Sequence, residues 1–203
     1  MTDRGQTFTL EAFVAAILLV ATVAFALQAV AVTANTASGA NTEPGNQHAG
    51  IAAGVLDEAV ENGSLRATLL YWDEDAEQFY GADPDDGYYL SEPPHTTLGE
   101  SLERAFDDRQ IRYNVDLHYS NEDGDRETQR LVESGTPSDD AVRIVETVTL
   151  YDDTPLVDEN EQQRSTTLGD VDGNGTAAFY APNAAEETAV YNVIRVEVVL
   201  WQS

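Results

Sequence analysis

One long apolar segment dominates the hydrophobic pattern of the chain. From Ala12 to Val32 only Thr22 and Gln28 are not plainly apolar. A helix of this length measures about 31 Å at about 1.5 Å per residue, which just spans the hydrocarbon core of a bilayer. The pattern therefore predicts a membrane-spanning helix near the amino terminus. A single carboxylate, that of Glu11, stands at its entrance.

The residues after this segment change character twice. Residues 34–50 are mostly small or polar and contain Pro44-Gly45, which predicts a linker because proline and glycine both interrupt helices. From about residue 46 apolar side chains recur at helical spacing, and Asn62-Gly63 ends the run. The apolar stripe of this predicted helix consists of Ile51, Val55, Leu56 and Val60.

Strand patterns fill most of the remaining sequence. Residues 65–72 predict a first strand, and the short segment near Tyr80 is a candidate to pair with it. Residues 111–119 alternate strictly, and the turn at 121–125 predicts that this strand returns as a hairpin. One face of the alternating strand carries Ile111, Tyr113, Val115, Leu117 and Tyr119, and the other carries Arg112, Asn114, Asp116 and His118.

The end of the chain contains the two strongest strand patterns, which begin at Ala141 and Ala189. Before them, Thr97 and Glu100 form a capping box that predicts a helix. Its apolar face consists of Leu98, Leu102, Ala105 and Phe106. The predicted fold class is therefore α+β: an N-terminal transmembrane helix, a short linker and helix, and a mainly antiparallel sheet.

Three interpretations of the apolar segment compete. A secretory signal peptide would be cut near Ala29-Val30-Ala31, but Asp3 and Glu11 cancel the positive charge that its amino-terminal region needs. A plain membrane anchor would keep Arg4 inside and place the acidic domain outside. The third interpretation is the one that explains Glu11.

The tetrad Arg4-Gly5-Gln6-Thr7, followed by the apolar helix, resembles the processing site of archaeal type IV prepilins, where a prepilin peptidase cuts after the glycine. The segment from Phe8 to Ala12 resembles the FTLEA-type start of haloarchaeal pilin-like membrane proteins. The resemblance implies cleavage after Gly5, which leaves Gln6 with the free α-amine. It also implies that Glu11 neutralises the α-amine of a neighbouring subunit during filament assembly, a paired role that suits an acid next to hydrocarbon.

The domain organisation follows from these patterns. We expect a leader at 1–5, a pilin-like transmembrane helix at 6–33, a linker at 34–50 and an acidic extracellular α+β domain at 51–203. The resemblance implies a structural or minor subunit of a type IV pilus-like or secretion-like surface filament. Its partners would be sibling subunits, a prepilin peptidase, the assembly machinery and the lipid bilayer. The alternative is a singly anchored extracellular domain that binds a ligand or partner without polymerising.

The charge of the chain narrows its partners and its setting. Ten basic residues, all of them arginine, stand against 37 acidic residues, which gives a net charge of −27. Nucleic acid and anionic headgroups are bound through basic patches, so nucleic acid is excluded as a partner. The composition resembles that of proteins from extremely halophilic archaea. Cysteine is absent, so neither disulfides nor thiolate metal sites are available.

Candidate chemistry is sparse. The three histidines show no spacing typical of a metal site or a catalytic triad, so we expect no enzyme activity. We also expect no cofactor, with calcium as the one candidate exception. Asp170, Asp172 and Asn174 match the start of a calcium-binding loop, although its twelfth position is Ala181 instead of glutamate. Asn62-Gly63-Ser64 and Asn174-Gly175-Thr176 are glycosylation sequons, which matter only if the domain is extracellular.

The charge also predicts salt dependence. At molar salt the Debye length falls to about 3 Å, so repulsion within the acidic chain is largely screened. We expect the isolated domain from about residue 47 onward to be compact at molar salt and to loosen in dilute buffer. Circular dichroism checks this, and identical spectra under the two conditions would contradict adaptation to high salt.

Overall fold

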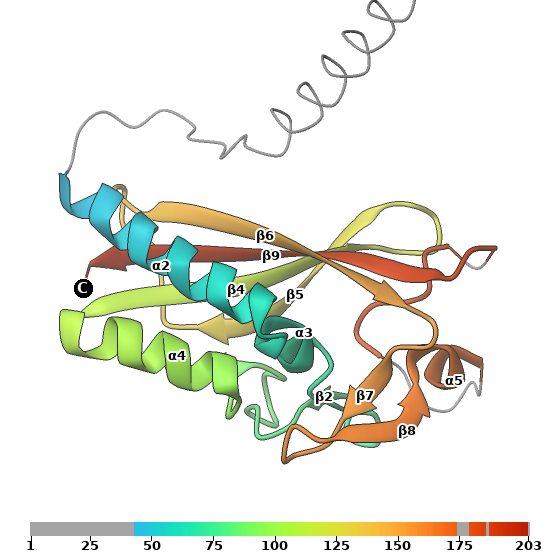
Figure 1. The fold of residues 1–203 in the computed structure, drawn as a ribbon. Coiled ribbons are helices and arrows are strands. Elements are labelled where there is room, and N and C mark those ends of the chain that lie inside the picture. The colour runs from blue at the N-terminus through green and yellow to red at the C-terminus, as the bar shows by residue number, and fades with distance from the viewer. Residues whose placement is uncertain (1–42, 174–178, 186, 203) are drawn as a thin grey trace, which may run out of the picture. The chain divides into compact units, whose positions relative to one another are not determined.

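The computed structural model describes residues 43–173, 179–185 and 187–202 (Figure 1). The chain divides into two compact units, Met1–Asn41 and Thr42–Ser203, and all described elements belong to the second. The predicted leader, the predicted transmembrane helix and the first part of the predicted linker lie outside the described residues. None of the helices in the described part is both long and apolar enough to cross a membrane.

A five-stranded sheet forms the centre of the domain, in the order β3-β5-β4-β9-β6. All of its neighbouring strands are antiparallel except the short pair β3–β5, which is parallel. The strands are β3 (Tyr89–Leu90), β4 (Ile111–Ser120), β5 (Arg126–Glu133), β6 (Val142–Tyr151) and β9 (Val190–Gln202). Two small ribbons add β1 (Trp72–Asp73) with β2 (Gln78–Phe79), and β7 (Pro155–Val157) with β8 (Gln163–Thr167). The prediction of an α+β domain with a mainly antiparallel sheet is confirmed.

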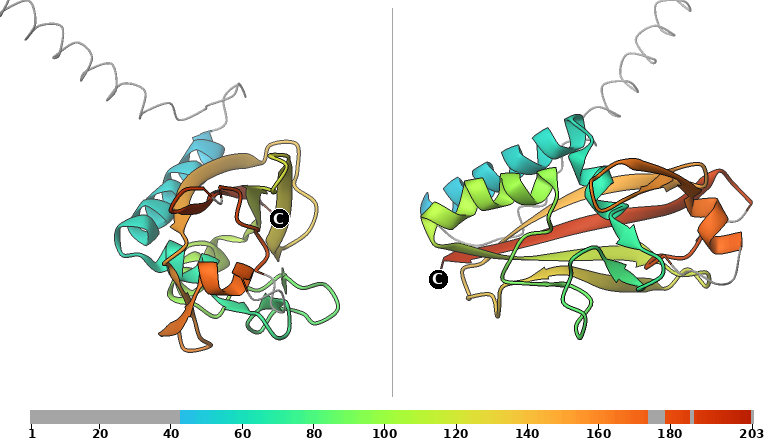
Figure 2. Two further views of the ribbon diagram at one scale, coloured as in Figure 1. Left: turned by 90° about the vertical axis from the view of Figure 1, so that its right-hand side faces the viewer. Right: turned by 90° about the horizontal axis from the view of Figure 1, so that it is seen from below.

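Helices cover one face of this sheet (Figures 1 and 2). They are α2 (Glu43–Glu61), α3 (Ser64–Leu69), α4 (Thr97–Phe106) with the short 3-10 turn η1 (Asp107–Arg109), and, beside β8, α5 (Leu168–Gly173). Helix α2 begins inside the segment 34–50 that was predicted as a linker. Pro44 lies in its first turn, where the missing amide hydrogen costs no helical hydrogen bond.

Helix α2 packs through a stripe that is shifted from the predicted one. Ile51 and Val55 of the predicted stripe are partly buried against the core. Leu56 is buried as expected, and Ala52 and Ala59 are buried with it. Val60 was predicted in the stripe but is 47% exposed. The spacing of Ala52, Leu56 and Ala59 puts small side chains on both sides of one leucine, and small side chains allow a helix to approach its neighbour closely.

The strand predicted at residues 65–72 is mostly wrong. Residues 64–69 form helix α3, which buries Leu65 and Leu69 one helical turn apart, and only Trp72 and Asp73 join a strand. A short apolar run fits a buried helix as well as a strand, so its periodicity does not distinguish them. The predicted pairing with the segment near Tyr80 is confirmed by the β1–β2 ribbon.

The amino terminus of α4 is capped differently from the prediction. The N-cap is Thr96, whose hydroxyl accepts a hydrogen bond from the amide of Gly99. The Glu161 carboxylate, from the loop between β7 and β8, accepts bonds from the amide and hydroxyl of Thr97 at 3.0 and 2.9 Å. An anion is favourable here because helix amino termini carry partial positive charge. The predicted buried face of α4 is confirmed at Leu98, Leu102 and Phe106.

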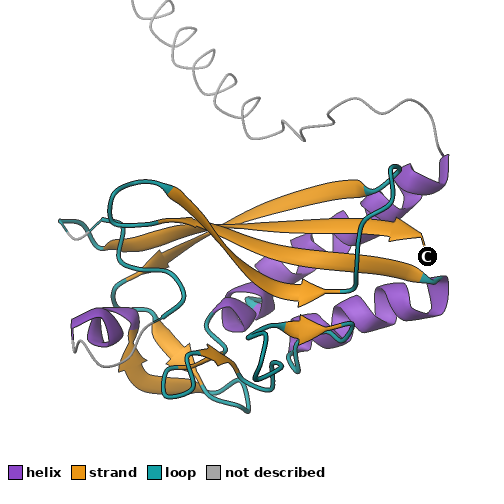
Figure 3. Ribbon diagram, turned by 180° about the vertical axis from the view of Figure 1, so that it is seen from behind, coloured by secondary structure: helices purple, strands orange, loops and turns teal. Residues whose placement is uncertain are grey.

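The connection from β5 to β6 crosses the uncovered face of the sheet. Because β4 and β9 lie between β5 and β6, residues 134–141 must pass over both strands. Seen from behind, this connection lies in front of the strands, whereas α2 and α4 lie beyond them (Figure 3). The two faces of the sheet are therefore covered unequally: helices on one, a single stretch of chain on the other.

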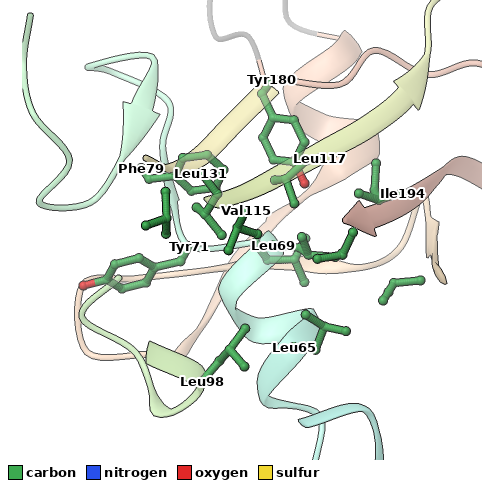
Figure 4. Packing of buried hydrophobic residues seen from close by; sticks show 14 of the residues in the cluster. Leu65, Leu69, Tyr71, Phe79, Leu98, Val115, Leu117, Leu131, Tyr180 and Ile194 are labelled. Atoms are coloured by element: carbon green, nitrogen blue, oxygen red, sulfur yellow. The ribbon is translucent and has the colours of Figure 1, made fainter. Parts of the chain in front are cut away.

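The core fills the space between the sheet and the helices (Figure 4). Strand β4 contributes alternate residues as predicted, including Val115 and Leu117, and β9 contributes Ile194. At one end of the core Tyr180 packs among the rings of Trp72, Phe79, Tyr119 and Phe179. Its hydroxyl is buried and has no hydrogen-bond partner among the described residues.

One acid points from the sheet toward the helices. Glu146 of β6 pairs with Val196, so its side chain lies on the inner face, next to α2. Burial raises the pKa of the Glu146 carboxyl, and the nearby carboxylate of Asp57 raises it further. An inward charge on an edge strand is a known means of discouraging further strand pairing. Strand β6 is such an edge.

We expect Glu146→Gln to raise the unfolding temperature at pH 7 by roughly 1–2 °C. The pKa of Glu146 is higher in the folded protein than in the unfolded chain, so its protonated form stabilises the fold relative to its charged form. This stabilisation is lost as the pH rises through the pKa of the folded protein, and glutamine, which stays neutral, avoids the loss. The gain of the variant should therefore vanish below the ordinary glutamate pKa of 4.5. Thermal unfolding at molar salt measures it, with the exposed Glu103→Gln as control. An equal gain at all pH values would contradict this assignment.

Candidate functional site

The residues predicted to carry processing and assembly are Arg4, Gly5, Gln6 and Glu11. All four lie outside the described residues, so their roles remain predictions. Two surfaces inside the domain can be compared with the sequence: the predicted calcium loop and the uncovered face of the sheet.

The predicted calcium ligands are only partly described. Asp170 lies in α5, and its carboxylate accepts hydrogen bonds from the amide and hydroxyl of Thr167 at 3.0 and 2.8 Å. These bonds hold the pKa of Asp170 below its usual range and make Thr167 and Asp170 a capping box for α5. The side chain of Asp172 and all of Asn174 lie outside the described residues. Within the described residues no group of three acidic or histidine side chains is placed to hold a metal.

An open hollow of about 650 Å³ lies beside the tip of the β4–β5 hairpin. Its lining includes the carboxylates of Glu122, Asp123 and Glu187, with Asn183 and Thr188 as neutral polar residues. The described lining contains neither histidine nor arginine. It is a solvated acidic surface and offers no paired acid and base.

The uncovered face of the sheet is the most unusual surface of the domain. We call it the outer sheet face, meaning the outward side chains of β4, β5, β6 and β9. Five of the chain's ten arginines lie on it, against three carboxylates. The arginines are Arg112, Arg126, Arg130, Arg143 and Arg195, and the carboxylates belong to Asp116, Glu133 and Glu197. In a chain with 37 acidic residues this concentration of arginine is not expected from composition.

Glu197 is the centre of one charge cluster on this face. Its carboxylate contacts Arg143 at 2.8 Å and Arg195 at 3.5 Å, and the His118 imidazole lies 3.8 Å away. The Glu197 side chain is only 13% exposed, whereas those of Arg143 and Arg195 are 62% and 42% exposed. A carboxylate this shielded from water depends on its cationic neighbours to offset the loss of hydration.

Arg130 is the centre of a second cluster. Its guanidinium contacts both carboxylate oxygens of Asp116, at 2.8 and 3.3 Å, and Glu133 at 3.0 Å. Two parallel bonds from one guanidinium to one carboxylate are a strong arrangement. The bond from Arg130 lowers the pKa of the Glu133 carboxyl, and the two acids raise the pKa of Arg130.

The β5–β6 connection closes one end of the outer sheet face. Asn114 accepts a hydrogen bond from the amide of Ser134 and donates one to the carbonyl of Gly135, at 2.8 and 2.9 Å. Val199 and Trp201 also point outward at this end, yet both are buried. The connection itself carries Asp139 and Asp140, both exposed to solvent.

The other end of the face remains open and is largely uncharged on β6 and β9. Val145, Thr147, Thr149, Tyr151 and Val193 occupy outward positions there. Tyr151 and Val193 are 42% and 47% exposed, two of the four large hydrophobic side chains with this exposure among the described residues. Flat, exposed β-branched and aromatic side chains next to paired charges are suited to contact with another protein.

The alternation in β4 already predicted a polar face with Arg112, Asn114, Asp116 and His118, and the structure confirms their common side. The clusters around Glu197 and Arg130 were not predicted. Their partners come from four strands, and only the pairing register brings those strands together. The sequence contains one indication of the Glu197 cluster, because Arg195 and Glu197 alternate with valines in the last strand.

Fold and surface together define a class of protein: an acidic α+β domain whose sheet has one helix-covered face and one arginine-rich face, preceded in the sequence by an apolar segment. The chain belongs to a family of unknown function, DUF7288, whose model matches residues 4–200. The match includes both the apolar segment and nearly the whole domain. No curated protein and no solved structure matched the chain.

We expect Glu197→Gln to lower the free energy of unfolding by about 1–2 kcal/mol, because it leaves Arg143 and Arg195 without their carboxylate. The loss is below that for a fully buried pair since both arginines are exposed. Urea unfolding at molar salt measures it. The control Glu122→Gln removes an exposed hairpin carboxylate; equal stability of the two variants would show that the cluster contributes nothing.

Proposed function

We propose that this protein is a membrane-anchored subunit of a type IV pilus-like or secretion-like surface filament in a halophilic archaeon. The observation that carries the proposal is the order Arg4-Gly5-Gln6-Thr7, apolar helix and Glu11 at its entrance. The family match supports treating this segment and the domain as one unit, because it begins at Arg4 and runs through the last strand.

In this proposal each predicted residue has one role. A peptidase cuts after Gly5, so Arg4 leaves with the leader and Gln6 becomes the first residue. Glu11 then pairs with the α-amine of a neighbouring subunit within the packed apolar helices. The alanines of the segment, such as Ala15, Ala16 and Ala24, support this packing because small residues let membrane helices approach closely.

Charge is the main obstacle to assembly of such subunits. Copies that each carry −27 repel one another, even though molar salt screens most of that repulsion. A contact between copies is favoured where the charge is locally balanced. The outer sheet face comes close to this condition, because its five arginines offset its three carboxylates and its other end, at Tyr151 and Val193, is uncharged. We propose it as the contact between the outside domains of neighbouring subunits.

The alternative remains a single anchored domain whose outer sheet face binds a different partner. The exposed pair Tyr151 and Val193 is compatible with either partner. The two proposals differ in the role of Glu11, which pairs with another subunit only in an assembly of several copies.

We expect Glu11→Gln to abolish incorporation into surface filaments while leaving the protein in the membrane fraction. The substitution strands the α-amine of the neighbouring subunit without its carboxylate. Loss of one partner of a poorly hydrated ion pair costs about 3–5 kcal/mol. Insertion should survive because glutamine is cheaper to bury than a charge. Sheared filaments and membranes are compared by immunoblotting.

The matched control is Glu58→Gln, which removes one carboxylate from the exposed surface of α2. It should enter filaments normally. In both variants mass spectrometry should find a mature chain that begins at Gln6. Normal filament entry of Glu11→Gln, or a native chain that retains Arg4, would favour the single anchored domain.

A further inference from the structure

The turn between α2 and α3 contains a feature that the proposed function does not use. Helix α2 ends where the amide of Asn62 donates to the carbonyl of Glu58, and α3 begins at Ser64. Between them Gly63 adopts a left-handed conformation with φ +80°, which glycine adopts without strain. The three residues Asn62-Gly63-Ser64 form an N-x-S sequon, the acceptor sequence for N-linked sugars.

The side chain of Asn62 is held by one atom and open at the other. Its Oδ1 accepts a hydrogen bond from the amide of Ser64 at 2.8 Å, which makes an Asx turn. Its Nδ2 has no hydrogen-bond partner among the described residues, and the residue is exposed. A sugar would be attached to Nδ2, which is free, whereas the Asx turn uses only Oδ1 of Asn62.

The surroundings leave room for a large substituent. Glu61, Asn62 and Gly63 are all exposed, and a Cβ atom built on Gly63 would meet nothing within 4 Å. The outer sheet face lies on the opposite side of the sheet from α2 and α3 (Figures 1 and 3). A glycan on Asn62 would thus extend into solvent without covering the proposed subunit contact.

We propose that Asn62 carries an N-linked glycan in the native protein. The proposal rests on the proposed function only in requiring that the domain is exported. The donor is a lipid-linked sugar phosphate. A bond forms between the anomeric carbon and Nδ2 of Asn62, the anomeric carbon–oxygen bond to the lipid phosphate breaks, and one amide proton is released.

The timing follows from burial. Ser64 is only 7% exposed because α3 packs Leu65 and Leu69 into the core, so the folded turn does not present the whole sequon to an enzyme. The core cluster that α3 joins includes Val115, Leu117 and Ile194, all of which come later in the chain (Figure 4). An exported chain that emerges amino terminus first therefore exposes the sequon before its covering strands exist. Modification precedes folding.

The test uses full-length protein purified from its native cells. Cleavage after Glu61 and after Arg66 by Glu-C and trypsin releases residues 62–66. We expect this peptide to be heavier by one or more sugar residues, with the added mass on Asn62. The Asn62→Gln and Ser64→Ala variants should lose the added mass, whereas Ser64→Thr, which preserves the sequon, should keep it.

An unmodified peptide 62–66 from the native protein would overturn the proposal. So would an added mass that survives in Ser64→Ala. The same digest reports the amino terminus, which separates the two hypotheses. A chain that starts at Gln6 without the sugar overturns the glycan alone, and a glycosylated chain that retains Arg4 supports the glycan while removing the support for pilin-like processing.

Discussion

Burial of two helices against one face of an antiparallel sheet is the interaction on which the rest of the domain depends. Ala52, Leu56 and Ala59 bring α2 onto the sheet, and α4 adds Leu98, Leu102 and Phe106. Each large apolar side chain buried in this way contributes about 1.5–3 kcal/mol relative to exposure. Since strand side chains alternate, a sheet covered on one side must present polar residues on the other. The clusters of the outer sheet face are the consequence of that requirement.

Electrostatics gives this second face its particular character. Any polar residue would satisfy an open strand position, yet half of the arginines of the chain are concentrated here. Arg130, Arg143 and Arg195 pair with Asp116, Glu133 and Glu197, so this surface carries a small excess of positive charge in a strongly acidic chain. The exposed side of α2 differs, with Asp57, Glu58 and Glu61 and no arginine. The domain thus has an acidic helical side and an arginine-rich sheet side.

The sequence predicted those elements whose pattern is local and long. The alternation of β4, the last two long strands and the buried face of α4 all required only neighbouring residues. The sequence-based prediction failed where residues far apart in the chain determine the local structure. Leu65 and Leu69 are helical and pack into a core that includes residues of later strands. The amino terminus of α4 receives additional hydrogen bonds from Glu161, 64 residues beyond Thr97. The Glu197 cluster likewise requires the register of three strands, which no local pattern contains.

The position of β9 has a consequence for how the sheet closes. The last strand of the chain lies between β4 and β6, so the sheet has a central gap until residues 190–202 arrive. The facing edges of β4 and β6 are then unpaired, and each is a template for another extended segment. The β9 segment of a second chain fits the gap as well as the chain's own, which is the condition for domain swapping. At high local concentration, the monomer is protected from exchange only once the chain's own β9 occupies the gap.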